Sequence, residues 1–112
     1  MTAYIVSLDN ENYNDFIKDG GLKIVDVKAE WCGPCKQLSP IFDELSSEFK
    51  DVATFGKIDA DDSRATVTEL GIRNIPTILV YSNGEVVDKF VGTNANRTNI
   101  LNALNKYSNN EN

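Results

Sequence analysis

The chain has 112 residues, which suits one domain with a single hydrophobic core. Its net charge of −6 disfavours non-specific binding to nucleic acid or anionic membranes, and we expect neither as a partner. No apolar stretch is long enough to span a bilayer, and the N-terminus lacks the basic and apolar regions of a secretory signal. We therefore expect a cytosolic protein, a setting in which structural disulfides are uncommon.

The first predicted elements are a strand, a short helix and a second strand. The strand covers 4–8, and the helix follows two candidate caps, Asp9 and Asn10. Gly20 begins a pair of glycines that ends this helix. The run 23–29 is rich in β-branched residues and predicts the second strand.

A long helix is expected next. Apolar residues alternate at spacings of three and four between positions 35 and 49, which marks one face of a helix. Pro40 lies inside it, and its missing N–H and its ring predict a kink. A third strand at 52–58 and a short helix at 63–70 follow.

The last part of the chain predicts a hairpin and a closing helix. The apolar run 77–81 suits a strand that is covered on both faces. Asn83-Gly84 is a strong hairpin signal, so the segment 85–91 should return antiparallel. Apolar residues at helical spacing between 100 and 107 then define the closing helix.

The order β-α-β-α-β-α-β-β-α indicates an α/β protein. It predicts a mixed central sheet with helices on both faces. We expect residues 1–108 to form the single domain and residues 109–112, the sequence "NNEN", to be a mobile tail.

Cys32 and Cys35 are the only cysteines, and they lie in the sequence "EWCGPCK" of a chain without histidine. Structural zinc needs four Cys or His ligands, so we expect no metal site. A cysteine hydrolase needs a base to activate its thiol, commonly histidine, which is missing. A structural staple is disfavoured because closing so short a loop removes little chain entropy. Two interpretations of the pair remain: two free thiols, or a working dithiol that is oxidised and reduced as part of the protein's function.

The position of the pair favours a working dithiol. Cys32 should lie where a strand ends and a helix begins, near unpaired N–H groups and the positive end of the helix dipole. Both stabilise a thiolate, which is the attacking form. Cys35 should lie one turn into the helix and be more shielded than an exposed Cys32, while Pro34 stiffens the turn after Gly33. This asymmetry suits an exchanger in which one sulfur attacks and the other resolves.

A Cys-x-x-Cys pair beside a βαβ pattern is typical of thioredoxin-like redox motifs, and the chain resembles the thioredoxin family over nearly its whole length. The residues that carry the resemblance are Asp26, "WCGPCK" (31–36), Pro40, Lys57, "IPT" (75–77), "NGE" (83–85) and Gly92. The resemblance implies the thioredoxin fold and the reduction of protein disulfides, with Cys32 as nucleophile and Cys35 as resolving thiol. It also implies a monomer without a bound cofactor, which receives electrons from NADPH through a flavoprotein, thioredoxin reductase.

Asp26 interrupts the apolar strand sequence "IVDV". It is either a partly solvated acid at a strand end or a buried acid with a raised pKa that exchanges a proton with Cys35. The resemblance favours the second role. Lys57 is either an edge-strand charge or a partner of Asp26; the residues alone favour the first, and the resemblance implies that it tunes Asp26.

Pro76 is, on the residues alone, an ordinary strand-initiating proline. The resemblance implies that its peptide bond is cis, lies against the Cys-x-x-Cys loop and exposes the backbone of Ile75 to an extended substrate segment. The residues expected to complete a small apolar docking patch are Trp31, Gly33, Pro34, Val91 and Gly92. Trp31 could also be core, but we expect it at the rim with its ring partly covered.

Two residues depart from the family pattern. Lys28 occupies a position that is often aromatic in bacterial members, on the same strand face as Asp26. Its amine either reaches solvent, which we expect, or adds positive charge near Asp26 and Cys35. Asn74 replaces a common glycine and should influence which substrates dock.

An alternative function is a non-redox binding subunit that uses the same docking surface. Such a role would survive the replacement of both cysteines by serine.

Overall fold

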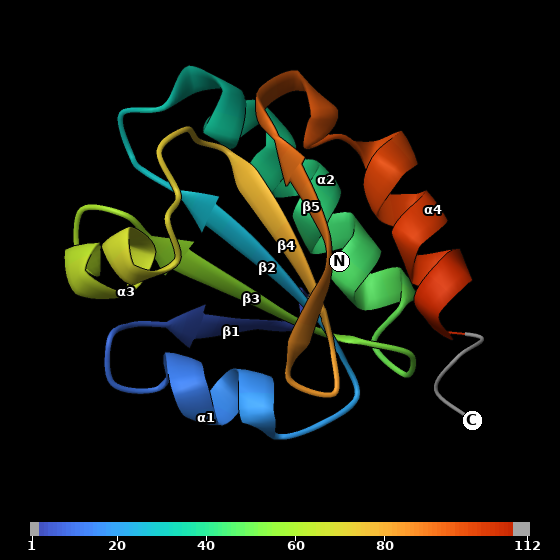
Figure 1. Ribbon diagram of the computed structural model, residues 1–112. Coiled ribbons are helices and arrows are strands. Elements are labelled where there is room, and N and C mark those ends of the chain that lie inside the picture. Colours follow the sequence, from blue (N-terminus) through green and yellow to red (C-terminus); the bar gives the residue numbers. More distant parts are fainter. Residues whose placement is uncertain (1–2, 109–112) are drawn as a thin grey trace.

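The computed structural model describes residues 3–108, and it confirms the predicted order of elements (Figure 1). The strands are β1 (Ile5–Leu8), β2 (Leu22–Lys28), β3 (Thr54–Asp59), β4 (Thr77–Ser82) and β5 (Glu85–Val91). The helices are α1 (Tyr13–Lys18), α2 (Gly33–Glu48), α3 (Arg64–Glu69) and α4 (Arg97–Ser108), with an unpredicted 3-10 turn at Gly92–Asn94. The predicted tail, 109–112, lies outside the described residues.

The five strands form one sheet in the order β1-β3-β2-β4-β5. β3 is parallel to both β1 and β2, whereas β4 is antiparallel to β2 and β5. The sheet is therefore mixed, as predicted. β2 lies inside it and places Asp26 beside Lys57 of β3 and Ile78 of β4.

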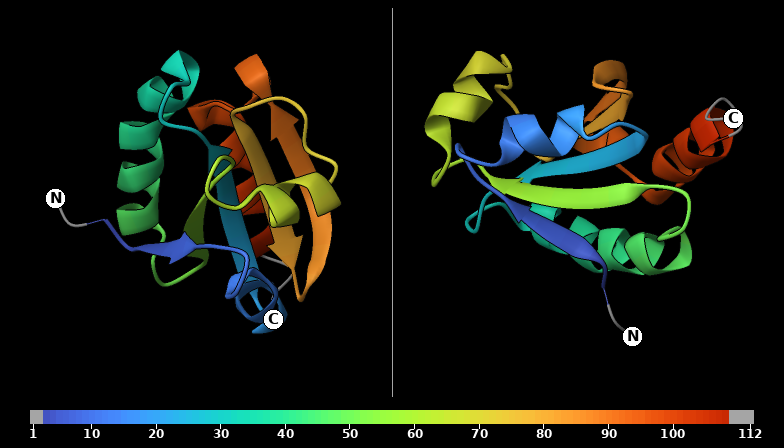
Figure 2. Two further views of the ribbon diagram at one scale, coloured as in Figure 1. Left: turned by 90° about the vertical axis from the view of Figure 1, so that its left-hand side faces the viewer. Right: turned by 90° about the horizontal axis from the view of Figure 1, so that it is seen from below.

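Helices cover both faces of the sheet, with α2 and α4 on one face and α1 and α3 on the other (Figure 2). Because side chains alternate along a strand, β2 sends Ile24 toward α2 and sends Val25 and Val27 toward the opposite helices. Asp26 shares the α2 face with Ile24. Phe42 of α2 meets Phe55 of β3 edge to face on this side, with ring centroids 5.4 Å apart, and this contact fixes α2 over the sheet.

The β4–β5 hairpin turns at Asn83-Gly84, as predicted. Asn83 has φ +51° and Gly84 has φ +89°, the backbone conformation that a two-residue turn of this kind requires. The helix α2 runs through Pro40 without interruption, and the kink at that residue stays a prediction.

The predicted caps of α1 are wrong. Asn12 precedes the first turn, and Asp9 instead accepts hydrogen bonds from the backbone N–H groups of Glu11 and Asn12 in the turn before the helix. The side-chain oxygen of Asn10 accepts a hydrogen bond from the backbone N–H of Thr66, at 3.0 Å, in the first turn of α3. Asn10 thus caps a helix that lies far from it in the sequence.

Candidate active site

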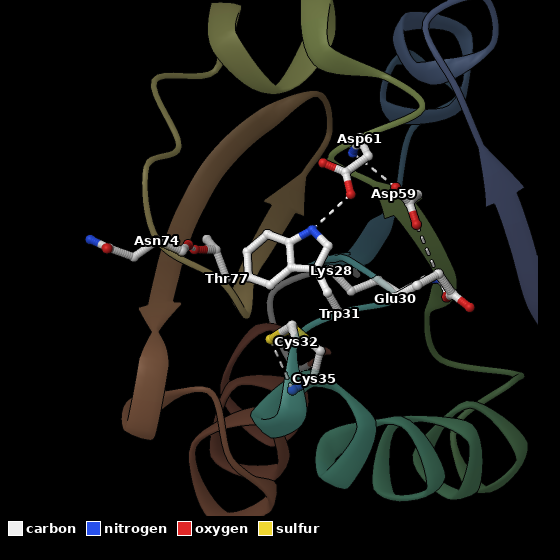
Figure 3. Close-up of a disulfide and its surroundings, with 9 residues drawn as sticks. All are labelled: Lys28, Glu30, Trp31, Cys32, Cys35, Asp59, Asp61, Asn74 and Thr77. Atoms are coloured by element: carbon white, nitrogen blue, oxygen red, sulfur yellow. Dashed lines mark hydrogen bonds and ion pairs between the residues drawn. A yellow bond between two sulfur atoms is a disulfide. The ribbon is translucent and has the colours of Figure 1, made fainter.

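Cys32 and Cys35 form a disulfide at the start of α2, with their Cα atoms 5.2 Å apart (Figure 3). Cys32 is the N-cap residue, and its Sγ accepts a hydrogen bond from the backbone N–H of Cys35 at 3.2 Å. Gly33 and Pro34 make the first helical turn, where the missing N–H of proline leaves no hydrogen bond unmade. The predicted strand-to-helix position is therefore confirmed, and a donor already points at the Cys32 sulfur.

The expected contrast between an exposed and a shielded cysteine is wrong for the disulfide form. Cys32 is 4% exposed and Cys35 is 2% exposed. The two residues cluster with Ala29, and Ile75 packs against them. In the disulfide form both cysteines are therefore buried to a similar extent.

Asp26 is completely buried (0% exposed), which excludes a partly solvated acid. Neither carboxylate oxygen has a hydrogen-bond partner among residues 3–108. Burial raises the pKa of Asp26 to about 7, although the charges of Lys57 and Lys28 lower it and that of Asp43 raises it. A carboxyl group with this pKa can both take up and release a proton near neutral pH.

Lys57 is neither an edge-strand residue nor a direct partner of Asp26. Its strand, β3, lies inside the sheet, and its Nζ donates to Ser39 Oγ and Asp43 Oδ1 of α2, both at 2.8 Å. The amine is therefore held on α2, and it acts on Asp26 through its charge alone, by lowering the pKa of that carboxyl.

The Ile75–Pro76 peptide bond is cis, as the resemblance implied. The carbonyl of Pro76 accepts a hydrogen bond from the N–H of Gly92 at 2.8 Å, which brings the two loops together. A cleft of about 450 Å³ opens between these loops and α2. Its lining consists of Pro34, Gln37, Leu38, Ile41, Ile75, Pro76, Gly92, Thr93, Ala95 and Asn96. Val91, which pairs with Thr77 at the end of the hairpin, is half-buried beside Gly92.

Trp31 lies at the rim, as predicted, but its ring is more open than expected, with 70% of the residue exposed. Its Nε1 donates a hydrogen bond to Asp61 Oδ2 at 2.7 Å (Figure 3). Sequence reasoning missed Asp61, because only its position within the acidic stretch "DADD" (59–62) singles it out.

Lys28 reaches two carboxylates, one exposed (Glu30) and one largely buried (Asp59). Its Nζ lies 3.0 Å from Glu30 Oε2 and 3.7 Å from Asp59 Oδ2, which agrees with an amine that extends toward solvent. Burial lowers the pKa of Lys28, but the hydrogen bond and charge of Glu30 and the charge of Asp59 outweigh it and raise the pKa above its usual value. The charge of Lys28 also lowers the pKa of Asp26, so the two interpretations of Lys28 are compatible.

Asn74 is exposed beside Ile75, and its backbone carbonyl accepts a hydrogen bond from Thr77 Oγ1 at 2.5 Å. Within residues 3–108, no group of three or more His, Cys, Asp or Glu side chains could hold a metal ion. No helix in the same range is long and apolar enough to cross a membrane.

A disulfide at a helix N-terminus, with a buried acid of near-neutral pKa on the same side of the sheet and an apolar cleft beside it, defines a thiol–disulfide oxidoreductase. Comparisons with known proteins agree. The thioredoxin family model matches residues 4–106. A thioredoxin of Staphylococcus haemolyticus is 36% identical over 103 residues, covering 92% of this chain and 97% of the relative. A thioredoxin of Chlamydia caviae is 38% identical over 98 residues, covering 88% and 93%.

Solved structures give the same result. Plasmodium falciparum thioredoxin aligns with a TM-score of 0.80 and 36% identity, covering 92% of this chain and 97% of that one. Thioredoxin f from spinach chloroplast aligns with a TM-score of 0.84 and 26% identity, covering 94% of each chain. The chain belongs to the thioredoxin family and has the thioredoxin fold. It is a thiol–disulfide oxidoreductase that acts on protein disulfides.

Proposed function

We propose that this protein reduces disulfides of other cytosolic proteins and is then re-reduced by thioredoxin reductase, a flavoprotein that takes its electrons from NADPH. The protein acts as a monomer of one domain, residues 1–108, without a bound cofactor. The observation that carries the proposal is the Cys32–Cys35 disulfide at the start of α2, on the sheet face where Asp26 is buried without a partner.

The first step of the proposed reaction belongs to Cys32. In the reduced protein its thiolate, stabilised by the N–H of Cys35, attacks one sulfur of the substrate disulfide. The substrate S–S bond breaks, its other sulfur leaves as a thiolate, and a mixed disulfide joins the two proteins. The new bond joins Cys32 Sγ to one substrate sulfur. One disulfide bond has replaced another, so the number of disulfide bonds is unchanged at this step.

The second step releases the substrate. Asp26 accepts the proton of the Cys35 thiol, and the resulting thiolate attacks Cys32 Sγ. The bond between Cys32 and the substrate breaks, and the substrate leaves with its two cysteines reduced. Two electrons have then passed from the dithiol to the substrate, and Cys32 and Cys35 are again a disulfide. A pKa of about 7 leaves Asp26 half ionised at neutral pH, ready for this step.

Docking is proposed to occur beside the disulfide, on Trp31, Gly33, Pro34, Ile75, Pro76, Val91 and Gly92. An extended segment of the substrate pairs with the backbone of Ile75 as an added strand, which recognises main chain rather than side chains. The adjoining cleft is lined mostly by apolar groups. A surface of this kind suits brief contacts with many substrates, and the exposed Asn74 side chain would influence which of them dock.

Serine variants test the function directly. Wild-type protein should catalyse the reduction of insulin by dithiothreitol, whereas Cys32→Ser should be inactive. Cys35→Ser should form the mixed disulfide but fail to resolve it, so that a substrate-linked species accumulates on non-reducing gels. The non-redox binding role is correct instead if the wild type does not accelerate the reaction and the Cys32→Ser/Cys35→Ser variant still binds the same partner protein as the wild type.

The electron source is tested separately. With NADPH and a purified thioredoxin reductase in place of dithiothreitol, wild-type protein should sustain NADPH oxidation coupled to insulin reduction. Activity with dithiothreitol but none with the reductase would contradict the proposed electron route and leave the exchange chemistry intact.

A further inference from the structure

The sheet face that carries Asp26 also carries a cation at a second position. Lys28 lies two residues after Asp26 on β2, and alternation along the strand places both on the α2 side. A small cavity of about 140 Å³ opens there. Its lining consists of Lys28, Ala29, Glu30, Cys35, Lys36, Ser39 and Lys57. The resolving cysteine and the two lysines whose charges act on Asp26 therefore border the same space.

We propose that Lys28 is a positioning residue for the dithiol: its ammonium group, held at this cavity by Glu30 and Asp59, stabilises the ionised Asp26 that accepts the Cys35 proton. The inference rests on the proposed role of Asp26 and adds a residue that nothing in the exchange chemistry itself requires. This stabilisation needs a positive charge, which an aromatic side chain at this position could not supply.

The ammonium of Lys28 lies beside two carboxylates. Asp59, which holds it at 3.7 Å, is only 15% exposed in its side chain. The other oxygen of that carboxylate accepts hydrogen bonds from the backbone N–H groups of Asp61 and Asp62, at 2.8 and 3.2 Å. Glu30 completes the site with a contact of 3.0 Å (Figure 3). The more buried of the two counterions, Asp59, is therefore itself held in place by backbone donors.

The partners of Lys28 do not cancel its effect on Asp26. Glu30 is 84% exposed, so water and salt screen its charge. The negative charge of Asp59 is partly balanced by the two backbone N–H groups that donate to its other oxygen.

The remaining charges near Asp26 come from β3 and α2. Lys57 is bound to Asp43, and Lys36 is exposed at the cavity rim. Of these groups, Lys57 and Lys28 lower the pKa of Asp26 and Asp43 raises it. Lys57 has the larger of the two lowering effects and Lys28 is a second, separate contribution, so removing the charge of Lys28 should raise the pKa of Asp26.

The position of the pKa makes a small effect measurable. With a pKa of about 7, Asp26 is half ionised at neutral pH. An upward shift of about half a unit, a modest change for one lost charge near a buried acid, would reduce the ionised fraction to roughly a quarter. The resolution step would then slow about twofold at pH 7, and its pH profile would move upward by the same half unit.

The test compares three variants of the full chain. Lys28→Met removes the charge and keeps most of the stem, while Lys28→Arg keeps the charge. Lys89→Met is the matched control, since Lys89 is exposed on β5 and the change in net charge is the same. The ¹³C carboxyl resonance of Asp26 is titrated by NMR in the disulfide form of each variant, and mixed-disulfide resolution is followed against pH by stopped flow in each reduced variant.

The proposal expects Lys28→Met to raise the Asp26 midpoint by about half a unit, with Lys28→Arg and Lys89→Met within about a tenth of a unit of wild type. An Asp26 midpoint in Lys28→Met that equals that of Lys89→Met would overturn it and leave Lys28 as a structural ion pair. If the midpoint moves while the resolution profile stays in place, the link from Lys28 to Asp26 stands and the proton-transfer role of Asp26 fails. The two failures are therefore distinguishable.

Discussion

Two buried polar sites, one on each face of the sheet, differ in whether they have hydrogen-bond partners. On the face covered by α1 and α3, the hydroxyls of Tyr13 and Tyr81 lie 2.6 Å apart and bond to each other, with their rings edge to face. On the α2 face, Asp26 has no hydrogen-bond partner among the described residues. Burial raises the pKa of all three groups, but only that of Asp26 comes near neutral pH.

The difference distinguishes polar groups that are buried for structural reasons from one that is buried for its chemistry. A buried hydroxyl pair satisfies itself and costs the fold little. An unpaired buried carboxylate costs several kcal/mol when it is ionised, so a fold selected for stability alone would place an apolar residue there. Ser63 Oγ is also buried without a partner, but a hydroxyl stays neutral, so Asp26 is the unpaired group whose ionisation points to a chemical role.

Removal of the Asp26 carboxyl should have the largest effect. We expect Asp26→Ala to slow the release of substrate from the mixed disulfide on the order of 10²-fold at pH 7, because the Cys35 thiol loses its proton acceptor. Attack by Cys32 should change much less. Stopped-flow measurement of the two steps with a fluorescent disulfide substrate separates them, and unchanged release kinetics would remove the catalytic assignment.

The same variant should be more stable than wild type at high pH. The folded pKa of Asp26, about 7, lies above its ordinary value of 3.8, so the folded protein binds the extra proton between these values. The free energy of unfolding of wild type should therefore fall as the pH rises from about 4 to about 7 and then level off. Asp26→Ala should gain a few kcal/mol at pH 8 and less at pH 5, by urea denaturation of the disulfide form. A gain that is equal at both pH values would show that ionisation of Asp26 is not the cause.

The tyrosine pair should show the reverse behaviour. Tyr81→Phe leaves the Tyr13 hydroxyl buried without a partner and should destabilise the protein by about 1–3 kcal/mol, with no change in the rate of disulfide exchange. The Tyr13→Phe/Tyr81→Phe variant should recover much of that loss, because neither hydroxyl then needs a partner. A drop in exchange rate in a folded Tyr81→Phe variant would contradict a purely structural role.

The smallest effect is expected at the rim. Asp61→Asn weakens the hydrogen bond to the Trp31 indole but leaves an acceptor in place, so stability should change by less than about 1 kcal/mol. The indole should become more mobile, which lowers the steady-state anisotropy of its fluorescence. The apparent KM for a protein substrate should rise by no more than severalfold, while kcat is unchanged. A large fall in kcat would mean that Asp61 acts on the dithiol rather than on docking.

Local sequence signals predicted the frame of the site well. Asn83-Gly84 determined the hairpin, and the change from a β-branched run to helical spacing placed Cys32 at a helix start, because both signals lie within a few residues of the structure that they cause. The buried acid was also visible, since "IVDV" puts a charge in an apolar strand.

Contacts between distant segments were not predictable. Asn10 caps a helix 56 positions away, Lys57 binds Asp43 of α2, and Trp31 binds Asp61. Each of these contacts depends on how α2, α3 and the loops settle on the sheet, which no local pattern specifies. The burial of Cys32 was not predicted for the same reason, because Ile75, which packs against it, comes from a distant segment of the chain.

The most direct test of the account is a ¹³C NMR titration of the Asp26 carboxyl in the wild-type disulfide form, read beside the pH profile of mixed-disulfide resolution. We expect a titration midpoint near 7 and a resolution rate that rises with pH through the same region. A carboxyl that titrates near 4, as an ordinary solvated aspartate does, would contradict it, because Asp26 would then be ionised at every pH at which the exchange is measured.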